Sequence, residues 1–225
     1  MALAICRTAS NILLGIVLNK HSKRFYDEGT RHLFATFEMI ALETWRNQDQ
    51  KSYFITDETI MKRFRPGWVY DTTDQEPEQA DTIEELAKKL GLNPEETAKT
   101  VKEFNDAVND KEFNLMELDG KATTGLSPNK TNWANKIDTP PYYGYPMEAH
   151  LTFTYGGVKT DLYGRVVTGE DVPIPGLWGA GEMTGLFYNE YPPATSVLRS
   201  LTFGKIIGTA LAKDLGKEPE LQSQL

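Results

Sequence analysis

The feature that most constrains the fold is a long apolar helix expected near the carboxyl end, over Ser196–Leu215. Apolar side chains leave little of its surface polar, which is typical of a helix buried in a larger body. Gly204 and Gly208 permit another backbone to approach closely. The amino end, at Thr195–Ser196, offers unsatisfied N–H groups and a partial positive charge, which suit an anion or an electron-rich carbonyl. A well-capped core helix without a ligand is the alternative.

A short strand precedes this helix and ends in small residues and a carboxylate. It reads Gly-Leu-Trp-Gly-Ala-Gly-Glu over residues 176–182, with the strand expected over Gly176–Ala180. Small residues let a strand edge touch a planar ligand, and Glu182 can bind sugar-like hydroxyls. A reduced flavin needs positive potential at its N1–C2=O edge, so strand and helix together favour a flavin.

Composition excludes several other classes of function. The 225-residue chain has a net charge of −8, which disfavours nucleic acid or an anionic membrane as partner. The longest strongly apolar run, Ile12–Leu18, is far shorter than the roughly 18 residues of a membrane span. Cys6 is the single cysteine, so no intrachain disulfide can form. A reducing compartment is therefore favoured, with the cytoplasm expected and the mitochondrion as alternative. No metal site is predicted.

Two helices with strong start and stop signals form a predicted helical hairpin. Thr82 caps the first, Glu85 completes a capping box and Gly91 ends the helix. Asn93 caps the second, whose first residue is Pro94. Its apolar face is expected at Thr97, Val101, Phe104 and Val108. We expect a structural role for this pair.

The other elements are shorter and alternate between strand and helix patterns. A helix is expected over Leu33–Arg46, with Trp45 on its apolar face, and one or two helical turns within Asp57–Phe64. Asp71–Gln79 is expected to be a loop. Strands are expected at Ile12–Leu18, Arg24–Tyr26, Ser52–Thr56, Leu151–Tyr155, Val158–Asp161 and Arg165–Thr168. Gly120–Pro146 has little periodicity, which is typical of a functional loop or an interface.

Several motifs together resemble one flavoprotein family. They are Gly15–Glu28, Leu118–Gly125, Pro128–Ala134, Phe153–Asp161, Pro175–Gly185, Gly185–Pro192 and Leu201–Lys205. The carboxyl-terminal segment resembles the flavin-binding part of the fumarate reductase/succinate dehydrogenase flavoprotein superfamily. The match is closer to its tricarballylate dehydrogenase-like branch, near the 3-ketosteroid dehydrogenases. The resemblance covers roughly residues 15–213.

The resemblance implies FAD as cofactor and assigns roles to individual residues. Glu182, next to Gly181, would meet the ribityl or nearby hydroxyls. Tyr191 matches a catalytic tyrosine that polarises a substrate carbonyl. The backbone of Thr195, Ser196, Val197 and Leu198 would face the pyrimidine edge of the flavin.

The resemblance also points to residues of the substrate-capping part. Arg24 and Phe25 match a cap motif for which a structural role is expected. Candidate substrate contacts from the irregular segment are Lys130, Asn132 and Tyr143, with surface or packing roles as the alternative.

The sequence departs from the family pattern in three ways. Thr152 and Phe153 stand where fumarate reductases carry His, and Tyr191 stands where they carry Arg, which argues against fumarate as substrate. Pro193 replaces a glycine and has no N–H to donate. No G-x-G-x-x-G follows a strand, although this motif holds the FAD pyrophosphate in the family. The sequence therefore suggests a truncated form lacking an amino-terminal segment.

These observations predict an α+β chain. We expect a helical and mixed substrate-capping domain over residues 1–146 and the carboxyl-terminal part of an FAD-binding α/β domain over 147–225. One hypothesis is an FAD-dependent dehydrogenase or reductase of small molecules, acting on CH–CH bonds or on ketonic or carboxylated substrates. The other is a non-catalytic remnant or interaction protein that no longer binds FAD stably. A partner chain or the missing segment would cover its exposed surface.

Overall fold

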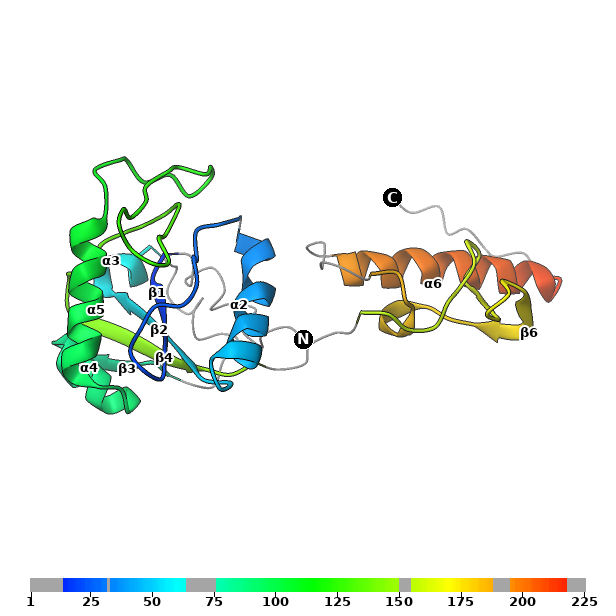
Figure 1. Cartoon of the computed structure of the whole chain (residues 1–225). Coiled ribbons are helices and arrows are strands. Elements are labelled where there is room, and N and C mark those ends of the chain that lie inside the picture. The colour runs from blue at the N-terminus through cyan, green and yellow to red at the C-terminus, as the bar shows by residue number, and fades with distance from the viewer. Residues whose placement is uncertain (1–13, 32, 64–75, 150–154, 188–194, 218–225) are drawn as a thin grey trace. The chain divides into compact units, whose positions relative to one another are not determined.

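The chain forms two compact units, which divide between Thr152 and Phe153. The computed structural model describes residues 14–31, 33–63, 76–149, 155–187 and 195–217, with the backbone alone for 33–37. We call residues 1–152 the sheet unit and residues 153–225 the helix unit; Figure 1 shows the elements of each. The boundary expected near residue 146 falls within a strand, Tyr142–Met147, whereas the two units divide after the end of this strand.

The sheet unit is built on a four-stranded antiparallel sheet with the order β1-β2-β4-β3. The strands are β1 (Ile16–Asn19), β2 (Ser52–Asp57), β3 (Glu78–Ala80) and β4 (Tyr142–Met147). Ile16 pairs with Ile55, Ser52 with Met147, and Glu78 with Gly144. The two central strands, β2 and β4, therefore come from distant parts of the chain.

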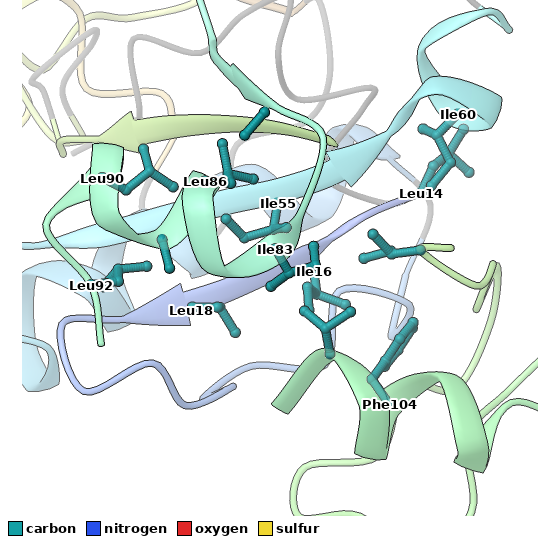
Figure 2. Packing of buried hydrophobic residues seen from close by; sticks show 14 of the residues in the cluster. Leu14, Ile16, Leu18, Ile55, Ile60, Ile83, Leu86, Leu90, Leu92 and Phe104 are labelled. Carbon is teal, nitrogen blue, oxygen red and sulfur yellow. The ribbon is translucent and has the colours of Figure 1, made fainter. Parts of the chain in front are cut away.

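Both faces of this sheet are covered by helices. Ile16, Leu18 and Ile55 point to one face and pack with the residues of α4 (Ile83–Leu90), as Figure 2 shows. Val17 and Phe54 alternate to the other face, where Ile40 of α2 (Leu33–Asn47) packs. Burial on both faces explains why β1 is a continuous apolar run rather than an alternating one.

The predicted helical hairpin is confirmed. The Thr82 Oγ1 accepts a hydrogen bond from the Glu85 N–H (3.2 Å) at the start of α4. The Asn93 Oδ1 accepts one from the Glu96 N–H (3.0 Å) at the start of α5 (Pro94–Ala107). Gly91 ends α4 with a left-handed φ of 72°. Because each start and stop is encoded locally, the boundaries follow from the sequence.

The short helix α3 (Glu58–Met61) follows β2 directly, within the predicted helical turns. Asp57 caps it, since its Oδ1 accepts a hydrogen bond from the Ile60 N–H (3.0 Å). Its Oδ2 accepts hydrogen bonds from the N–H groups of Asp138 and Thr139. One buried carboxylate thus fixes both the helix start and the loop that leads into β4.

The expectation for Gly120–Pro146 was wrong at its end, because Tyr142–Met147 forms the central strand β4. Pro146 made the segment an unlikely central strand, since proline cannot donate to a ladder. However, β3 pairs only with Tyr142–Gly144. Pro146 therefore lies where β4 has β2 as its neighbour, opposite Tyr53.

Other expectations for short strands also need correction. Arg24–Tyr26 is not a strand and has only an isolated bridge between Leu18 and Arg24. The loop expected over Asp71–Gln79 includes the start of β3 at Glu78. Trp45 is exposed rather than packed against the sheet. Most of the strand expected over Leu151–Tyr155 lies outside the described residues.

The helix unit combines a β-hairpin with one long helix. Its elements are β5 (Arg165–Val167), β6 (Pro173–Trp178), the 3-10 turn η1 (Gly181–Met183) and α6 (Thr195–Asp214). Val158–Asp161 is not a strand; Val158 and Thr160 make only isolated bridges there. The long helix expected over Ser196–Leu215 is confirmed as α6.

Two glycines explain how closely the helix unit packs. A Cβ on Gly157 (φ 141°) would lie 2.4 Å from the Met183 carbonyl oxygen, so only glycine fits this crossing of two backbones. A Cβ on Gly164 (φ 80°) would lie 2.4 Å from the Ile207 side chain. The second contact seats the β5–β6 hairpin directly on α6.

Candidate functional site

The structure brings the predicted carboxylate and the start of the long helix together. Glu182 lies in η1, which follows β6 and packs against α6. The Arg199 NH2 donates a hydrogen bond to the Glu182 Oε2 at 2.7 Å. A Cβ on Gly181 would lie 3.5 Å from the Ser200 Oγ, an ordinary contact distance. The Glu182 turn therefore packs against the amino-terminal part of α6, next to its first turn.

Arg199 is the buried part of this arrangement. Its side chain is 2% exposed, whereas that of Glu182 is 43% exposed. The Arg199 NH1 donates to the Thr184 carbonyl oxygen (2.9 Å), and the Phe187 ring lies 4.6 Å from the guanidinium carbon. The Arg199 Nε is buried without a hydrogen-bond partner in the part of the chain that the structure describes. The arginine is buried, whereas the carboxylate that it binds is half-exposed.

The four residues predicted to face a flavin edge form the first turn of α6. Thr195 and Ser196 are half-buried, while Val197 and Leu198 are 65% and 62% exposed. The first four N–H groups of any α-helix have no partner within the helix. The amino end of α6 therefore places the positive end of a helix dipole in the part of the helix that packs against the Glu182 turn.

The predicted catalytic residue, Tyr191, lies outside the described residues, as does the turn Pro192–Ala194. Its role stays a prediction.

The three predicted substrate contacts lie in the sheet unit and bond to protein groups. The buried Lys130 Nζ donates to the Gly15 carbonyl oxygen (2.6 Å). The Asn132 Nδ2 donates to the Gly29 carbonyl oxygen (2.9 Å), and its Oδ1 accepts from the Gly120 N–H (2.7 Å). These bonds give both residues a packing role, and their contact with a substrate stays a prediction.

Tyr143 does not lie with the other two candidates. Lys130 lies over the Phe104 ring, whereas Tyr143 shares a sheet face with Tyr145 of the α2 side. The Tyr143 hydroxyl donates to the Glu58 Oε2 at 2.6 Å, and this bond holds the pKa of Glu58 below its usual value. The candidate substrate contacts therefore do not converge on one point.

Sequence reasoning missed Arg199, although a signal for it was present. It precedes Phe203 by four residues and Ile207 by eight, so it shares their helix face. Ile207 packs under the β5–β6 hairpin. A cation on a face that is otherwise apolar must find a partner there. The carboxylate predicted just upstream, Glu182, was the available one.

A separate groove of about 530 Å³ lies between the β5–β6 hairpin and the second half of α6. Its lining contains none of the predicted site residues. The groove is lined by Tyr163, Arg165, Trp178, Lys205, Ile206, Thr209, Ala210, Lys213 and Asp214. The candidate site rests on the contact between η1 and α6, not on this groove.

Two features that mark other classes of function are absent from the described ranges. No helix within them is both long and apolar enough to cross a membrane. The same residues contain no group of three or more His, Cys, Asp or Glu side chains that could hold a metal ion.

Comparison with known proteins points to flavoproteins. The chain is 31% identical to the NADH:acrylate oxidoreductase of Vibrio harveyi over 210 residues, which are 89% of this chain and 18% of that protein. It is 29% identical to a 3-oxosteroid 1-dehydrogenase of Mycobacterium tuberculosis, over 90% of this chain and 39% of that protein. The chain thus spans only 18% to 39% of the length of these relatives.

A solved structure gives the same indication. The open conformation of a flavocytochrome c3 fumarate reductase matches 93% of this chain and 34% of its own, with a TM-score of 0.69 and 25% identity. The mixed α/β architecture described above is therefore that of a known flavoprotein fold.

A protein-family model described as an FAD binding domain matches residues 4–196. That range is well over half of the 225 residues and includes the capping motif, the helical hairpin and the Glu182 turn. The chain therefore belongs to the FAD binding domain family, whose cofactor is FAD.

Proposed function

We propose that this chain is part of an FAD-dependent oxidoreductase that acts on a CH–CH bond or on a ketonic or carboxylated small molecule. The observation that carries the proposal is the hydrogen bond between Arg199 and Glu182, which joins the predicted hydroxyl-binding carboxylate to the predicted flavin-facing helix end. The family match over residues 4–196 supports FAD as the group bound there.

The described residues fit one part of FAD. Glu182 presents a half-exposed carboxylate, and a carboxylate can accept hydrogen bonds from hydroxyl groups such as those of a ribityl chain. The positive end of the α6 dipole, at the first turn, favours an electron-rich carbonyl edge. FAD supplies hydride-transfer chemistry when bound, and the protein supplies binding, orientation and electrostatics.

The substrate belongs to the proposal. Tyr191 is assigned the donation of a hydrogen bond to the substrate carbonyl, which would stabilise charge that develops on that oxygen. The motif over Gly185–Pro192 favours the tricarballylate dehydrogenase-like branch, and Tyr191 in place of an arginine argues against fumarate.

Titration of the full chain with FAD tests this proposal. We expect saturable changes in the flavin absorbance bands and a bleach when substrate is added. Glu182→Gln should weaken FAD binding about 10-fold, because a hydrogen bond to a charged group contributes about 1.5 kcal/mol or more. Glu170→Gln is the matched control, since Glu170 is an exposed acid of the same unit. No saturable change with the wild-type chain, or equal losses in both variants, would contradict the proposal.

A second candidate, a non-catalytic interaction protein, is favoured by the exposed apolar side of α6. Val197, Leu198 and Leu201 are each more than 60% exposed. An apolar surface of this kind is typical of a protein interface. A chain that binds no FAD but associates at micromolar concentration would support this candidate over the first.

A further inference from the structure

Arg199 connects the two halves of the proposed flavin-binding surface. One guanidinium bonds to Glu182 in η1 and to the Thr184 carbonyl that follows it. Its own backbone directly follows the first turn of α6, Thr195–Leu198. The Arg199 side chain therefore links the Glu182 carboxylate and the Thr184 carbonyl to the start of α6.

The burial of Arg199 is costly in itself. The side chain is 2% exposed and its Nε has no hydrogen-bond partner in the described ranges. A buried cation with an unused donor contributes less to stability than an apolar side chain of similar volume. Packing alone does not account for an arginine here, whereas the orientation of an exposed carboxylate does.

The guanidinium is suited to this task by its shape. Its planar fork donates in two directions at once, to a carboxylate and to a backbone carbonyl, and the Phe187 ring lies 4.6 Å from its central carbon. A lysine could keep the charge but could not hold both acceptors in the same plane. The contacts thus define an orientation for Glu182 as well as a charge partner.

We propose that Arg199 is a positioning residue for FAD, which fixes Glu182 against the first turn of α6 so that both contact the cofactor together. This inference rests on the proposed function. Arg199 acts through Glu182 and the Thr184 carbonyl, and has no direct contact with the reacting atoms.

A double-mutant cycle on FAD affinity tests the proposal. Arg199→Gln and Glu182→Gln should each weaken binding about 10-fold, and the double variant should also lose about 10-fold rather than about 100-fold, because paired residues act as one unit. Arg199→Lys should recover part of the affinity. Ile207→Val is the control: it should lower the stability of the same helix face and leave FAD affinity within about 2-fold.

The outcomes separate this inference from the proposed function. If the wild-type chain binds no FAD, the proposed function fails and the role of Arg199 fails with it. If the wild type binds FAD but the losses in the cycle are additive, or Ile207→Val weakens binding as much as Arg199→Gln, only the positioning role is overturned. Should Arg199→Gln not fold, Arg199→Lys replaces it. If Arg199→Lys weakens FAD binding and the added Glu182→Gln substitution weakens it no further, the proposal is supported. If the two losses of affinity add, the proposal is overturned.

Discussion

Three charged side chains are buried together in the sheet unit. The Arg24 NH2 donates to the Glu28 Oε2 (2.7 Å), and the Glu28 Oε1 accepts from the Val17 N–H (2.7 Å). The Lys130 Nζ donates to the Gly15 carbonyl oxygen nearby. The structural role expected for Arg24 follows from these bonds, since they tie two loops to the first strand.

Lys130 should make the stability of the sheet unit depend on pH. Burial lowers the pKa of this lysine from 10.5 to about 8. Below pH 8, Lys130 is protonated in both the folded and the unfolded chain. Between pH 8 and about 10.5 only the unfolded chain keeps the proton, so the free energy of unfolding rises with pH.

Lys130→Met removes this titration and provides the test. The stability of the wild type relative to the variant should increase by about 2 kcal/mol between pH 7 and pH 10. Urea denaturation at several pH values measures it, with Lys88→Met as an exposed control. A pH-independent difference would show that Lys130 reaches solvent.

At the residue scale, the sequence predicted the candidate residues but not their contact partners. Glu182 and the start of α6 were found because small residues, a carboxylate and a helix start are adjacent in sequence. The hydrogen-bond partner of Glu182, Arg199, was not predicted. Arg199 lies within an apolar run, and its burial depends on how η1 packs on α6. Similarly, Lys130 gave no sign of being buried, since its acceptor, Gly15, is 115 residues away.

At the scale of elements, local signals predicted the helices better than the strands. The α4–α5 hairpin carries its own caps, so its limits were readable from Thr82, Gly91 and Asn93. The strand β4 was missed because Gly144 and Pro146 interrupt its pattern, and its place in the sheet depends on pairing with the distant β2.

Two glycine substitutions should have opposite effects on stability. Gly91→Ala should cost about 1 kcal/mol, because Gly91 has a φ of 72°, although no atom of the described residues lies within 4 Å of a Cβ there. Gly204→Ala should stabilise by about 0.5–1 kcal/mol, because Gly204 is inside a helix and also has open space. Thermal unfolding followed by circular dichroism measures both. A destabilised Gly204→Ala would mean that atoms beyond the described residues cover this side of α6.

At the scale of the whole molecule, α6 has two apolar sides. Ile207 is buried under the β5–β6 hairpin, whereas Val197, Leu198 and Leu201 are exposed. Among the described residues, a Cβ on Gly204 or Gly208 would meet no atom within 4 Å outside the neighbouring backbone of the helix. The sequence predicted burial in a larger body, and the described residues of the helix unit cover only one side of α6. The exposed side is therefore expected to drive association.

Leu201→Lys tests that expectation. Leu201 is 69% exposed, so the substitution should change the free energy of unfolding by no more than about 0.5 kcal/mol. Association, followed by sedimentation velocity over a range of concentrations, should decrease. Leu118→Lys is the control, because Leu118 is equally exposed but belongs to a loop of the sheet unit. Equal effects of the two variants would rule out α6 as the associating surface.

The pairing of β2 with β4 has a consequence for how the sheet unit folds. Tyr143 and Glu58, whose side chains are hydrogen-bonded, are 85 residues apart in sequence. The chain between them includes the α4–α5 hairpin, whose contacts are local and can form early. Closing the long loop costs conformational entropy before the contacts between β2 and β4 can stabilise the sheet. The sheet unit should therefore fold more slowly than its helical content suggests, with the docking of β4 on β2 as the late event.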